Sequence, residues 1–237
     1  MLNKTRAIVL HHVKYGDSSL IVTLYSERYG RIACMVNGAR SKKSRFPVTL
    51  FQPLSILDAD FYYRQSREVQ RLKEAGSAYI YQTVPYSNTK SAVALFLAEV
   101  LNLSLREEEN NPLLFSFIFH ALQLFDHLGE STSWFHHWFM IHLTRYLGFF
   151  PQKALLDGKG IPMPEMDAFS MLTPGSSDAF TAILTSPQRP PELLPFKHRE
   201  RQELLDRIIR YYGLHIDGFA RLKSWAVLQE VFREGLS

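Results

Sequence analysis

Four cations stand close together near the start of the chain, and their spacing suits a polyanionic ligand. They lie within six consecutive positions, with only serines between them: Arg40, Lys42, Lys43 and Arg45. A cluster of this kind repels itself, so a negatively charged partner stabilises it. A phosphate backbone is such a partner, because its binding releases condensed counterions. The cluster therefore predicts a nucleic-acid contact, with a solvated loop of ordinary surface charge as the alternative.

Aromatic side chains beside arginines offer a second way to hold nucleic acid. Phe61, Tyr62 and Tyr63 precede Arg64 and Arg67, the composition of a base-stacking platform with phosphate-binding neighbours. Alternation along a strand puts Tyr62 on the opposite face from Phe61 and Tyr63. We therefore expect the three rings to be divided between the core and the surface.

Residue types that commonly bind metals or form covalent intermediates show no such pattern. His136, His137 and His142 share one expected helix, but their spacing does not converge on one ion. Cys34 is the single cysteine, which excludes an intramolecular disulfide and a cysteine-rich zinc site. Residues 158–160 lack the spacing of a phosphate-binding loop. We expect no catalytic residue, no metal and no cofactor.

Net charge divides the chain unevenly. Residues 1–80 carry thirteen Lys or Arg against six Asp or Glu, a net charge of +7. Residues 81–160 carry −2 and residues 161–237 carry −1. This asymmetry favours one polyanion-binding module joined to a nearly neutral remainder.

The first eighty residues have the pattern of short β-strands separated by turn signals. The expected strands span residues 5–13, 20–25, 31–36, 51–63 and 69–75. Five short strands and a long loop predict a small closed barrel, with the oligonucleotide-binding (OB) barrel as the leading candidate. A small SH3-like or split barrel fits the pattern almost as well.

The remainder of the chain has mainly helical periodicity. The expected helices span residues 88–105, 112–128, 131–147, 177–184, 197–212 and 221–232. Asn88 is the expected N-cap of the first helix, and Ser131 or Ser133 that of the third. Residues 149–197 hold most of the prolines and predict an irregular excursion. The predicted fold class is α+β, with an OB-fold nucleic-acid-binding domain at 1–80 and a helical domain at 81–237.

The expected helix at 131–147 is apolar over most of its surface. Its large apolar side chains are Trp134, Phe135, Trp138, Phe139 and Ile141. Burial on most sides explains them, and a groove for a partner peptide is the alternative. No apolar run approaches the roughly 20 residues that span a bilayer, and no signal peptide is recognisable. We therefore expect a cytoplasmic protein without a membrane partner.

Four motifs within the first 44 residues resemble those of a known family. They occur in order as AIVLH at 7–11, GDSSL at 16–20, LYSExxG at 24–30 and NGARSKKS at 37–44. Together they resemble the N-terminal barrel of the bacterial DNA repair family RecO. Weaker similarities, YLGF at 146–149 and LKSWxxL at 222–228, extend the match over most of the chain.

The resemblance implies a non-catalytic recombination mediator, associated with the nucleoid, with an OB-fold domain and a helical domain. Such proteins bind single- and double-stranded DNA, anneal complementary strands and recognise the acidic, apolar C-terminal tail of single-strand binding protein. With RecR they help load RecA onto the coated DNA. The resemblance assigns the DNA contact to the basic loop and lets two more arginines extend the phosphate track: Arg40, Lys42, Lys43, Arg45, Arg31 and Arg6.

The resemblance also places the peptide groove in the helical domain, where we assign Trp138, Arg145 and Tyr146 to it. Many family members carry two Cys-x-x-Cys pairs after the Leu-Gly-aromatic motif. Residues 149–197 contain no cysteine here, which excludes a zinc site of that kind.

Two other classes of protein remain open at this point. An OB-fold RNA-binding protein would prefer structured RNA to single-stranded DNA. A metal-dependent nuclease would need acidic residues brought together from separate elements. The run of glutamates at 107–109 is expected to be a solvated loop rather than part of such a centre.

Overall fold

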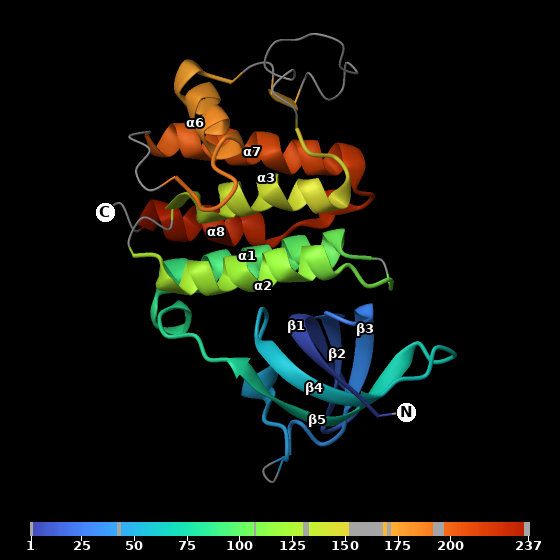
Figure 1. The fold of residues 1–237 in the computed structure, drawn as a ribbon. Helices are drawn as coiled ribbons and strands as arrows, with labels where there is room; N and C mark the ends of the chain where they lie inside the picture. The colour runs from blue at the N-terminus through green and yellow to red at the C-terminus, as the bar shows by residue number, and fades with distance from the viewer. Residues whose placement is uncertain are drawn as a thin grey trace. The chain divides into compact units, whose positions relative to one another are not determined.

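Five strands at the N-terminal end of the chain close into a barrel, and helices follow (Figure 1). The computed structural model describes residues 2–41, 44–106, 108–129, 133–151, 168–169, 172–191 and 197–234. The strands are β1 (Leu2–Tyr15), β2 (Ser19–Ser26), β3 (Gly30–Val36), β4 (Ile56–Tyr62) and β5 (Val69–Tyr79). The predicted α+β fold class and five-stranded barrel are confirmed.

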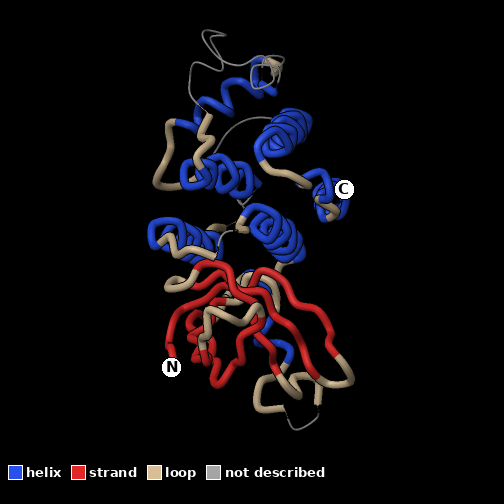
Figure 2. The backbone as a smooth tube through the Cα atoms, turned by 90° about the vertical axis from the view of Figure 1, so that its right-hand side faces the viewer, coloured by secondary structure: helices blue, strands red, loops and turns tan. Residues whose placement is uncertain are grey.

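The order of the strands around the barrel is β1-β2-β3-β5-β4. Strand β1 pairs antiparallel with both β2 and β4, and a short parallel pairing of β3 with β5 completes the closure. Figure 2 shows the curved strands around a common interior. This topology is that of an OB-type barrel.

The barrel interior is filled by alternate residues of every strand. In β3 the pattern is strict, with Ile32, Cys34 and Val36 inside and their neighbours half-buried on the outside. Phe61 is fully buried, whereas Tyr62 is 45% exposed, so the predicted division of these rings is confirmed. Burial also raises the pKa of the Cys34 thiol to about 12.

A β-bulge in β1 changes which residues face outward. The register with β2 shifts between Val9 and His11. Before the bulge, Ala7 and Val9 point into the barrel core. After it, His11, Val13 and Tyr15 are exposed, and so is Lys14 near the end of the strand. A bulge inserts one extra residue and re-aims the side chains that follow, so the odd-numbered residues of β1 point inward before it and outward after it.

The expected strand at 51–63 begins later than predicted. A 3-10 turn, Val48–Phe51, precedes it, and Leu54 has a positive φ of 64°. Backbone hydrogen bonds join Val9 to Ser55 and Leu54 to Val9 across this turn. Phe51 and Leu54 are buried, so their apolar character reflects core packing in a turn rather than strand pairing.

Six helices follow the barrel within the described part of the chain. They are α1 (Asn88–Ser104), α2 (Pro112–His127), α3 (Phe135–Leu147), α6 (Pro174–Leu184), α7 (His198–His215) and α8 (Ser224–Glu234). None of these helices is long and apolar enough to cross a membrane.

Helix caps differ from the predicted ones at two places. Ser87, not Asn88, is the N-cap of α1, because its side chain accepts a hydrogen bond from the Lys90 backbone N–H. Helix α3 follows Trp134 without a side-chain cap, so Ser133 does not cap it, and Ser131 lies outside the described residues. The helix ends at Gly148, as predicted, with φ at 86° in the left-handed region that favours glycine.

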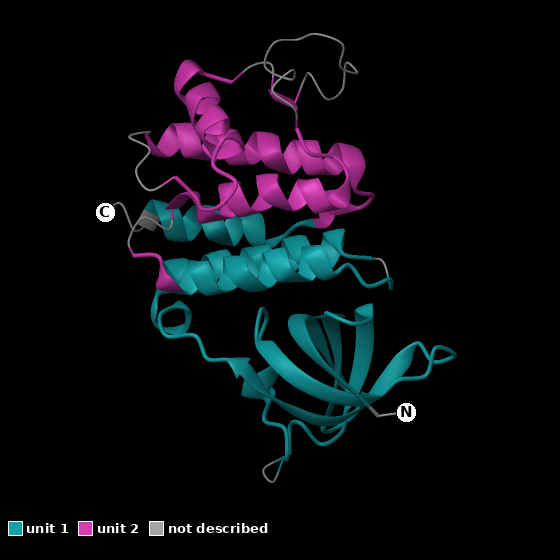
Figure 3. Ribbon diagram, viewed as in Figure 1, with its two compact units in different colours: residues 1–126, 222–237 teal, residues 127–221 magenta. Residues whose placement is uncertain are grey.

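The chain forms two compact units, shown in Figure 3. Residues 1–126 and 222–237 form unit 1, which holds the barrel, α1, α2 and α8. Residues 127–221 form unit 2, which holds α3, α6 and α7. The helices of unit 1 therefore belong with the barrel, and α8 returns to pack against α1.

A buried carboxylate ties the exit of the barrel to α2 within unit 1. Asp126 accepts hydrogen bonds from the Tyr79 hydroxyl and from the backbone N–H groups of Gln82, Thr83 and Val84. Burial opposes the charged form, but these donors prevail and lower the pKa of Asp126 to about 2. The segment that leaves β5 is therefore fixed to the helices.

Candidate nucleic-acid interface

Three neighbouring strands form one outward side of the barrel, which we call the outer face; its side chains are exposed on β1 and half-buried on β2 and β3. Its side chains come from the second half of β1 (His11, Val13, Tyr15), from β2 (Ser19, Ile21, Thr23) and from β3 (Arg31, Ala33, Met35). Strand pairing places them in rows. One row runs across four strands as Val13, Ile21, Met35 and the exposed Arg71 of β5.

The length of the outer face suits a short piece of single strand. From Arg31 to Asn37 the chain advances six residues, about 20 Å in a strand. Tyr15 is 53% exposed at one end of this path and offers a ring for base stacking. In an OB-type barrel, this strand face and the loops at its two ends commonly hold oligonucleotides.

The basic loop adjoins one end of the outer face. The backbone N–H of Arg40 donates to Ser18, and its guanidinium donates to the Gly16 carbonyl at 3.3 Å. The loop is thereby held to the β1–β2 turn, beside Tyr15. Arg45 is exposed and forms an ion pair with Glu74 at 2.9 Å. Lys42 and Lys43 lie outside the described residues, so their part in the cluster stays a prediction.

A polar pocket of about 280 Å³ adjoins the other end of the outer face. Thr23 and Ala33 of the outer face line it, and so do the aromatic ring of Tyr63 and the amide of Gln65. Its charged lining consists of Arg31, Arg67, Glu68 and Glu108. We call this the loop pocket, since residues 63–68 between β4 and β5 form one wall.

A buried amide holds the wall of the loop pocket in shape. Gln70 is 3% exposed, and its side-chain oxygen accepts from the Arg64 backbone N–H at 2.8 Å. Its amide nitrogen donates to the carbonyls of Arg64 and Arg67, at 3.0 and 2.6 Å. Three hydrogen bonds from one side chain define the loop conformation before any ligand binds, which lowers the ordering cost of binding.

Two of the predicted phosphate contacts are engaged with helices of unit 1. Arg31 donates from Nη1 to the carbonyls of Asn102 and Leu105 and from Nη2 to Oδ1 of Asn102, at the C-terminal end of α1. Arg6 forms a double hydrogen bond with Glu27 and lies 4.7 Å from the ring centre of Phe119. Both arginines pack the barrel against α1 and α2, a role that sequence patterns did not reveal.

The predicted peptide groove lies in unit 2, around α3. Trp138 is 2% exposed and donates its indole N–H to the Ser186 carbonyl at 2.7 Å. Arg145 is exposed and stacks on Phe150, with 3.8 Å between guanidinium carbon and ring centre. Tyr146 is half-buried. All residues from Phe135 to Thr144 are buried, so the predicted burial of this helix on most sides is confirmed, while the groove stays a prediction.

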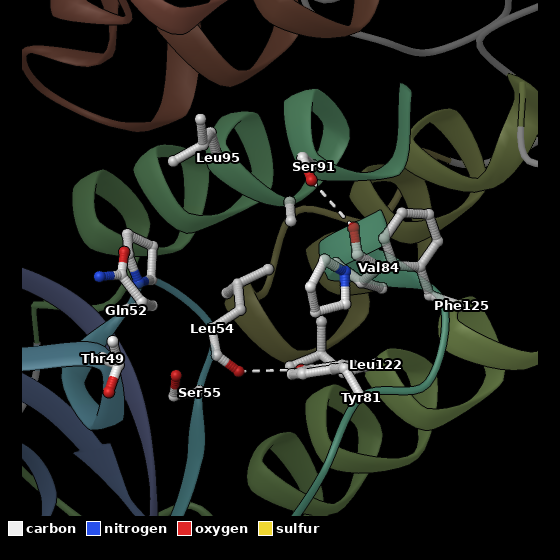
Figure 4. A pocket seen from close by; sticks show the side chains of 13 residues that line it. Thr49, Gln52, Leu54, Ser55, Tyr81, Val84, Ser91, Leu95, Leu122 and Phe125 are labelled. Atoms are coloured by element: carbon white, nitrogen blue, oxygen red, sulfur yellow. Dashed lines mark hydrogen bonds between the residues drawn. The ribbon is translucent and has the colours of Figure 1, made fainter. Parts of the chain in front are cut away.

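Unit 1 also holds a larger apolar pocket of about 440 Å³, shown in Figure 4. Leu54, Leu95, Leu122 and Phe125 contribute to its walls, and the Tyr81 hydroxyl donates to the Leu54 carbonyl at its edge. None of the described residues that line it has a charged side chain. It therefore offers no phosphate contact and does not belong to the interface described above.

Sequence patterns did not single out Tyr15, Arg71, Glu68 or Gln70 as parts of the site. Tyr15 directly precedes the Gly16-Asp17 turn, and an aromatic residue at a strand end was the signal available. The remaining positions depend on the pairing of β3 with β5, which joins segments far apart in the sequence. Among the described residues, no group of three His, Cys, Asp or Glu could hold a metal ion.

The fold and the outer face define an OB-type barrel protein, a class whose members commonly hold nucleic acid. The family "Recombination protein O N terminal" matches residues 1–96, and "Recombination protein O C terminal" matches residues 87–153. The chain is 34% identical over 241 residues to the DNA repair protein RecO of Phocaeicola vulgatus, covering 98% of this chain and 100% of the relative.

Two further relatives carry the same name and match over nearly their full length. The DNA repair protein RecO of Bacteroides fragilis is 35% identical over 241 residues, covering 98% of this chain and 100% of the relative. That of Flavobacterium psychrophilum is 33% identical over 235 residues, covering 97% and 98%. The chain belongs to the RecO family of bacterial DNA repair and recombination proteins.

Proposed function

We propose that this protein is a recombination mediator that makes or breaks no covalent bond. It binds single- and double-stranded DNA, anneals complementary strands and, with RecR, helps load RecA onto DNA coated by single-strand binding protein. One observation carries the DNA-binding part. The outer face of an OB-type barrel runs between the basic loop, which holds Arg40, and the loop pocket. Family membership supports the recombination role.

The physics of annealing is charge neutralisation. Two single strands repel each other, and a cationic surface that contacts both lowers this repulsion and raises their effective concentration. Arg40, Arg45 and Arg71 are exposed on the described part of the barrel, and Lys42 and Lys43 add two further charges to the basic loop. No base sequence needs to be recognised for this step, because phosphates are the common feature.

The decisive experiment is annealing of complementary strands coated with their cognate single-strand binding protein. The coat is used with and without its acidic C-terminal tail. We expect annealing to be accelerated on the intact coat and to be slower when the tail is missing, because the tail brings the protein to the DNA. Binding of bare DNA without any annealing of coated strands would leave only a basic OB module and contradict the mediator function.

The basic loop has its own test. Replacing Lys42 and Lys43 with alanine should weaken binding to all DNA sequences alike and lower the salt slope of the binding constant by about one to two units. Fluorescence anisotropy at several salt concentrations measures this slope. A matched control removes two exposed cations of α7 in unit 2, Arg199 and Arg210. An unchanged slope in the Lys42/Lys43 variant would exclude the basic loop as the contact.

A further inference from the structure

The loop pocket differs from the basic loop in its balance of charge. Two arginines, Arg31 and Arg67, and two glutamates, Glu68 and Glu108, line the pocket. A phosphate placed there would meet as much formal repulsion as attraction. A neutral ligand with both hydrogen-bond donors and acceptors meets no such conflict. The pocket is therefore suited to a polar, uncharged group rather than to the DNA backbone.

The donors and acceptors of the loop pocket narrow its ligand further. Carboxylates only accept hydrogen bonds and guanidinium groups only donate them. Arg31 uses three of its five N–H groups in hydrogen bonds to Asn102 and Leu105 at the end of α1. Arg67 is therefore the main donor to a ligand in the pocket. A matching ligand presents an amino group beside a carbonyl or ring nitrogen. Nucleobases with an exocyclic amino group have this arrangement, and a carboxylate accepting from N4 of cytosine is a recurrent pairing.

An aromatic ring supplies the apolar surface that a base needs. Tyr63 lines the loop pocket, and its ring is stacked on Tyr29 with 4.1 Å between ring centres. Tyr29 in turn packs edge-on against the buried Phe61. These contacts hold Tyr63 against the barrel core. A fixed ring offers a stacking surface that costs little conformational entropy on binding.

The size of the loop pocket fits one base. Its volume of about 280 Å³ lies just below the roughly 300 Å³ at which the range for small-molecule pockets begins. Thr23 and Ala33 connect it to the outer face, so a strand lying on that face can place one base in the pocket. The hydrogen bonds of Gln70 fix the 63–68 wall of the pocket before a base binds.

We propose that the loop pocket binds a single unpaired base that carries an exocyclic amino group, with Glu68 and Glu108 as acceptors, Arg67 as donor and Tyr63 as the stacking surface. This inference rests on the proposed function, because it assumes that a single strand lies on the outer face. In a duplex each base is stacked on both faces and its Watson–Crick edge is paired, so a duplex cannot place a base against Tyr63 and into the pocket. The pocket thus distinguishes an unpaired strand from a paired one at one position.

Oligo(dC) and oligo(dT) of equal length test the proposal, since both are pyrimidines with the same backbone charge and only cytosine has an amino group. Anisotropy titrations, slightly above neutral pH, should show tighter binding of oligo(dC) by about fivefold to tenfold. Glu108→Met removes an acceptor and should lower this preference at least threefold. Glu68→Met should act in the same direction.

Glu109→Met is the matched control. Glu109 is the exposed neighbour in the same loop and is not part of the pocket lining, yet its replacement removes the same charge. It should keep the preference for oligo(dC). Affinity for duplex DNA should be the same in the Glu108 and Glu109 variants. The ratio between the two oligomers cancels general effects of net charge.

Three results would contradict the proposed binding of a base in the loop pocket, and each leads to a different conclusion. Equal affinity for both oligomers with annealing intact would refute the pocket and leave the mediator function standing. If Glu109→Met loses as much of the preference for oligo(dC) as Glu108→Met does, the preference is caused by overall charge and not by the pocket. If neither oligomer binds, both the pocket and the proposed function are wrong.

Discussion

At the scale of single residues, arginines of the same barrel have different roles that depend on what surrounds them. Arg40 is exposed, with one long hydrogen bond to a turn carbonyl. Arg31 instead satisfies carbonyls at the end of α1, where the helix dipole favours a cation. Burial, and then the nearby Arg106, lower the pKa of Arg31 from its usual value. Arg31 remains a cation, and its hydrogen bonds hold the barrel to the end of α1.

Replacing Arg31 with methionine should therefore affect stability more than DNA binding. We expect a loss of about 1.5–3 kcal/mol of unfolding free energy, because hydrogen bonds from a charged group to half-buried carbonyls are lost. The salt slope of DNA binding should stay the same. Urea denaturation and salt titrations measure the two quantities.

Arg40→Met is the comparison variant, and the opposite pattern is expected for it. Its stability should be unchanged and its salt slope about one unit lower. A lower slope in Arg31→Met with full stability would show that Arg31 contacts phosphate after all.

At the scale of elements, α3 carries three buried histidines in their neutral form. Burial lowers the pKa of His137 and of His142 to about 4, and lowers that of His136 as well, where the neighbouring His137 and Arg201 add to the effect. His137 and His142 each have a ring nitrogen hydrogen-bonded to a carbonyl, of Arg201 and Ile183. The helix packs against α6 and α7 without a charge on these rings.

Unit 2 should consequently lose stability as the pH falls from 6.5 to 5. In the unfolded chain these histidines take up protons below pH 6.5, whereas in the folded state the pKa of His137 and of His142 is about 4 and that of His136 is also lowered, so all three stay neutral at pH 5. The unfolded state binds more protons in this window, so acid favours it, by about 1–2 kcal/mol per histidine at pH 5. Urea titrations of a Trp225→Phe variant follow this change through Trp134 and Trp138.

The exposed His120 of α2 provides a control. His120→Gln should leave the pH dependence of the unfolding free energy as it was, whereas His137→Gln should reduce it. A constant stability of unit 2 between pH 6.5 and 5 would contradict the neutral state of the three rings.

At the scale of the whole molecule, unit 1 is assembled from two separate parts of the chain. Helix α8 packs on α1, and Glu99 of α1 accepts hydrogen bonds from the backbone N–H groups of Lys223 and Ser224. Trp225 lies 6.4 Å from Phe96, measured between ring centres. The last residues of the chain therefore complete the helical layer that follows the barrel.

Ending the chain after residue 221 should therefore destabilise unit 1 rather than unit 2. We expect the amides of α1 to exchange hydrogen at least tenfold faster, since the apolar surface under α8 is exposed, while α3, α6 and α7 keep their protection. Glu99→Ala, which removes only the contact to the start of α8, should give a smaller effect of the same kind. Faster exchange confined to unit 2 would contradict the division into units.

Much of this fold could be predicted from local patterns, and the failures have physical causes. The strand at residues 31–36, the helix start at Pro112 and the helix end at Gly148 depend on neighbouring residues and were confirmed. The N-cap of α1 was misplaced by one residue because Ser87 and Asn88 are both good caps. Only the backbone angles of the folded chain distinguish them.

The candidate site was harder to predict than the fold. The basic loop is visible as a run of charges, whereas the loop pocket combines segments up to 85 residues apart, from Thr23 to Glu108. The bulge in β1 moves the outward positions by one residue, and no local signal marks it. The contacts of Arg31 with the end of α1 and of Arg6 with Phe119 could not be predicted, because the sequence does not show which helices these arginines meet; their contact with phosphate stays a prediction.

The closed order of the barrel has a consequence for how copies of the protein meet one another. Strand β1 is paired on both sides, and the parallel pairing of β3 with β5 covers what would otherwise be two open edges. An open edge exposes unpaired backbone groups, to which a neighbouring copy can add a strand. Copies of the protein that meet at high concentration therefore find no open edge at these paired positions to which a further strand could be added.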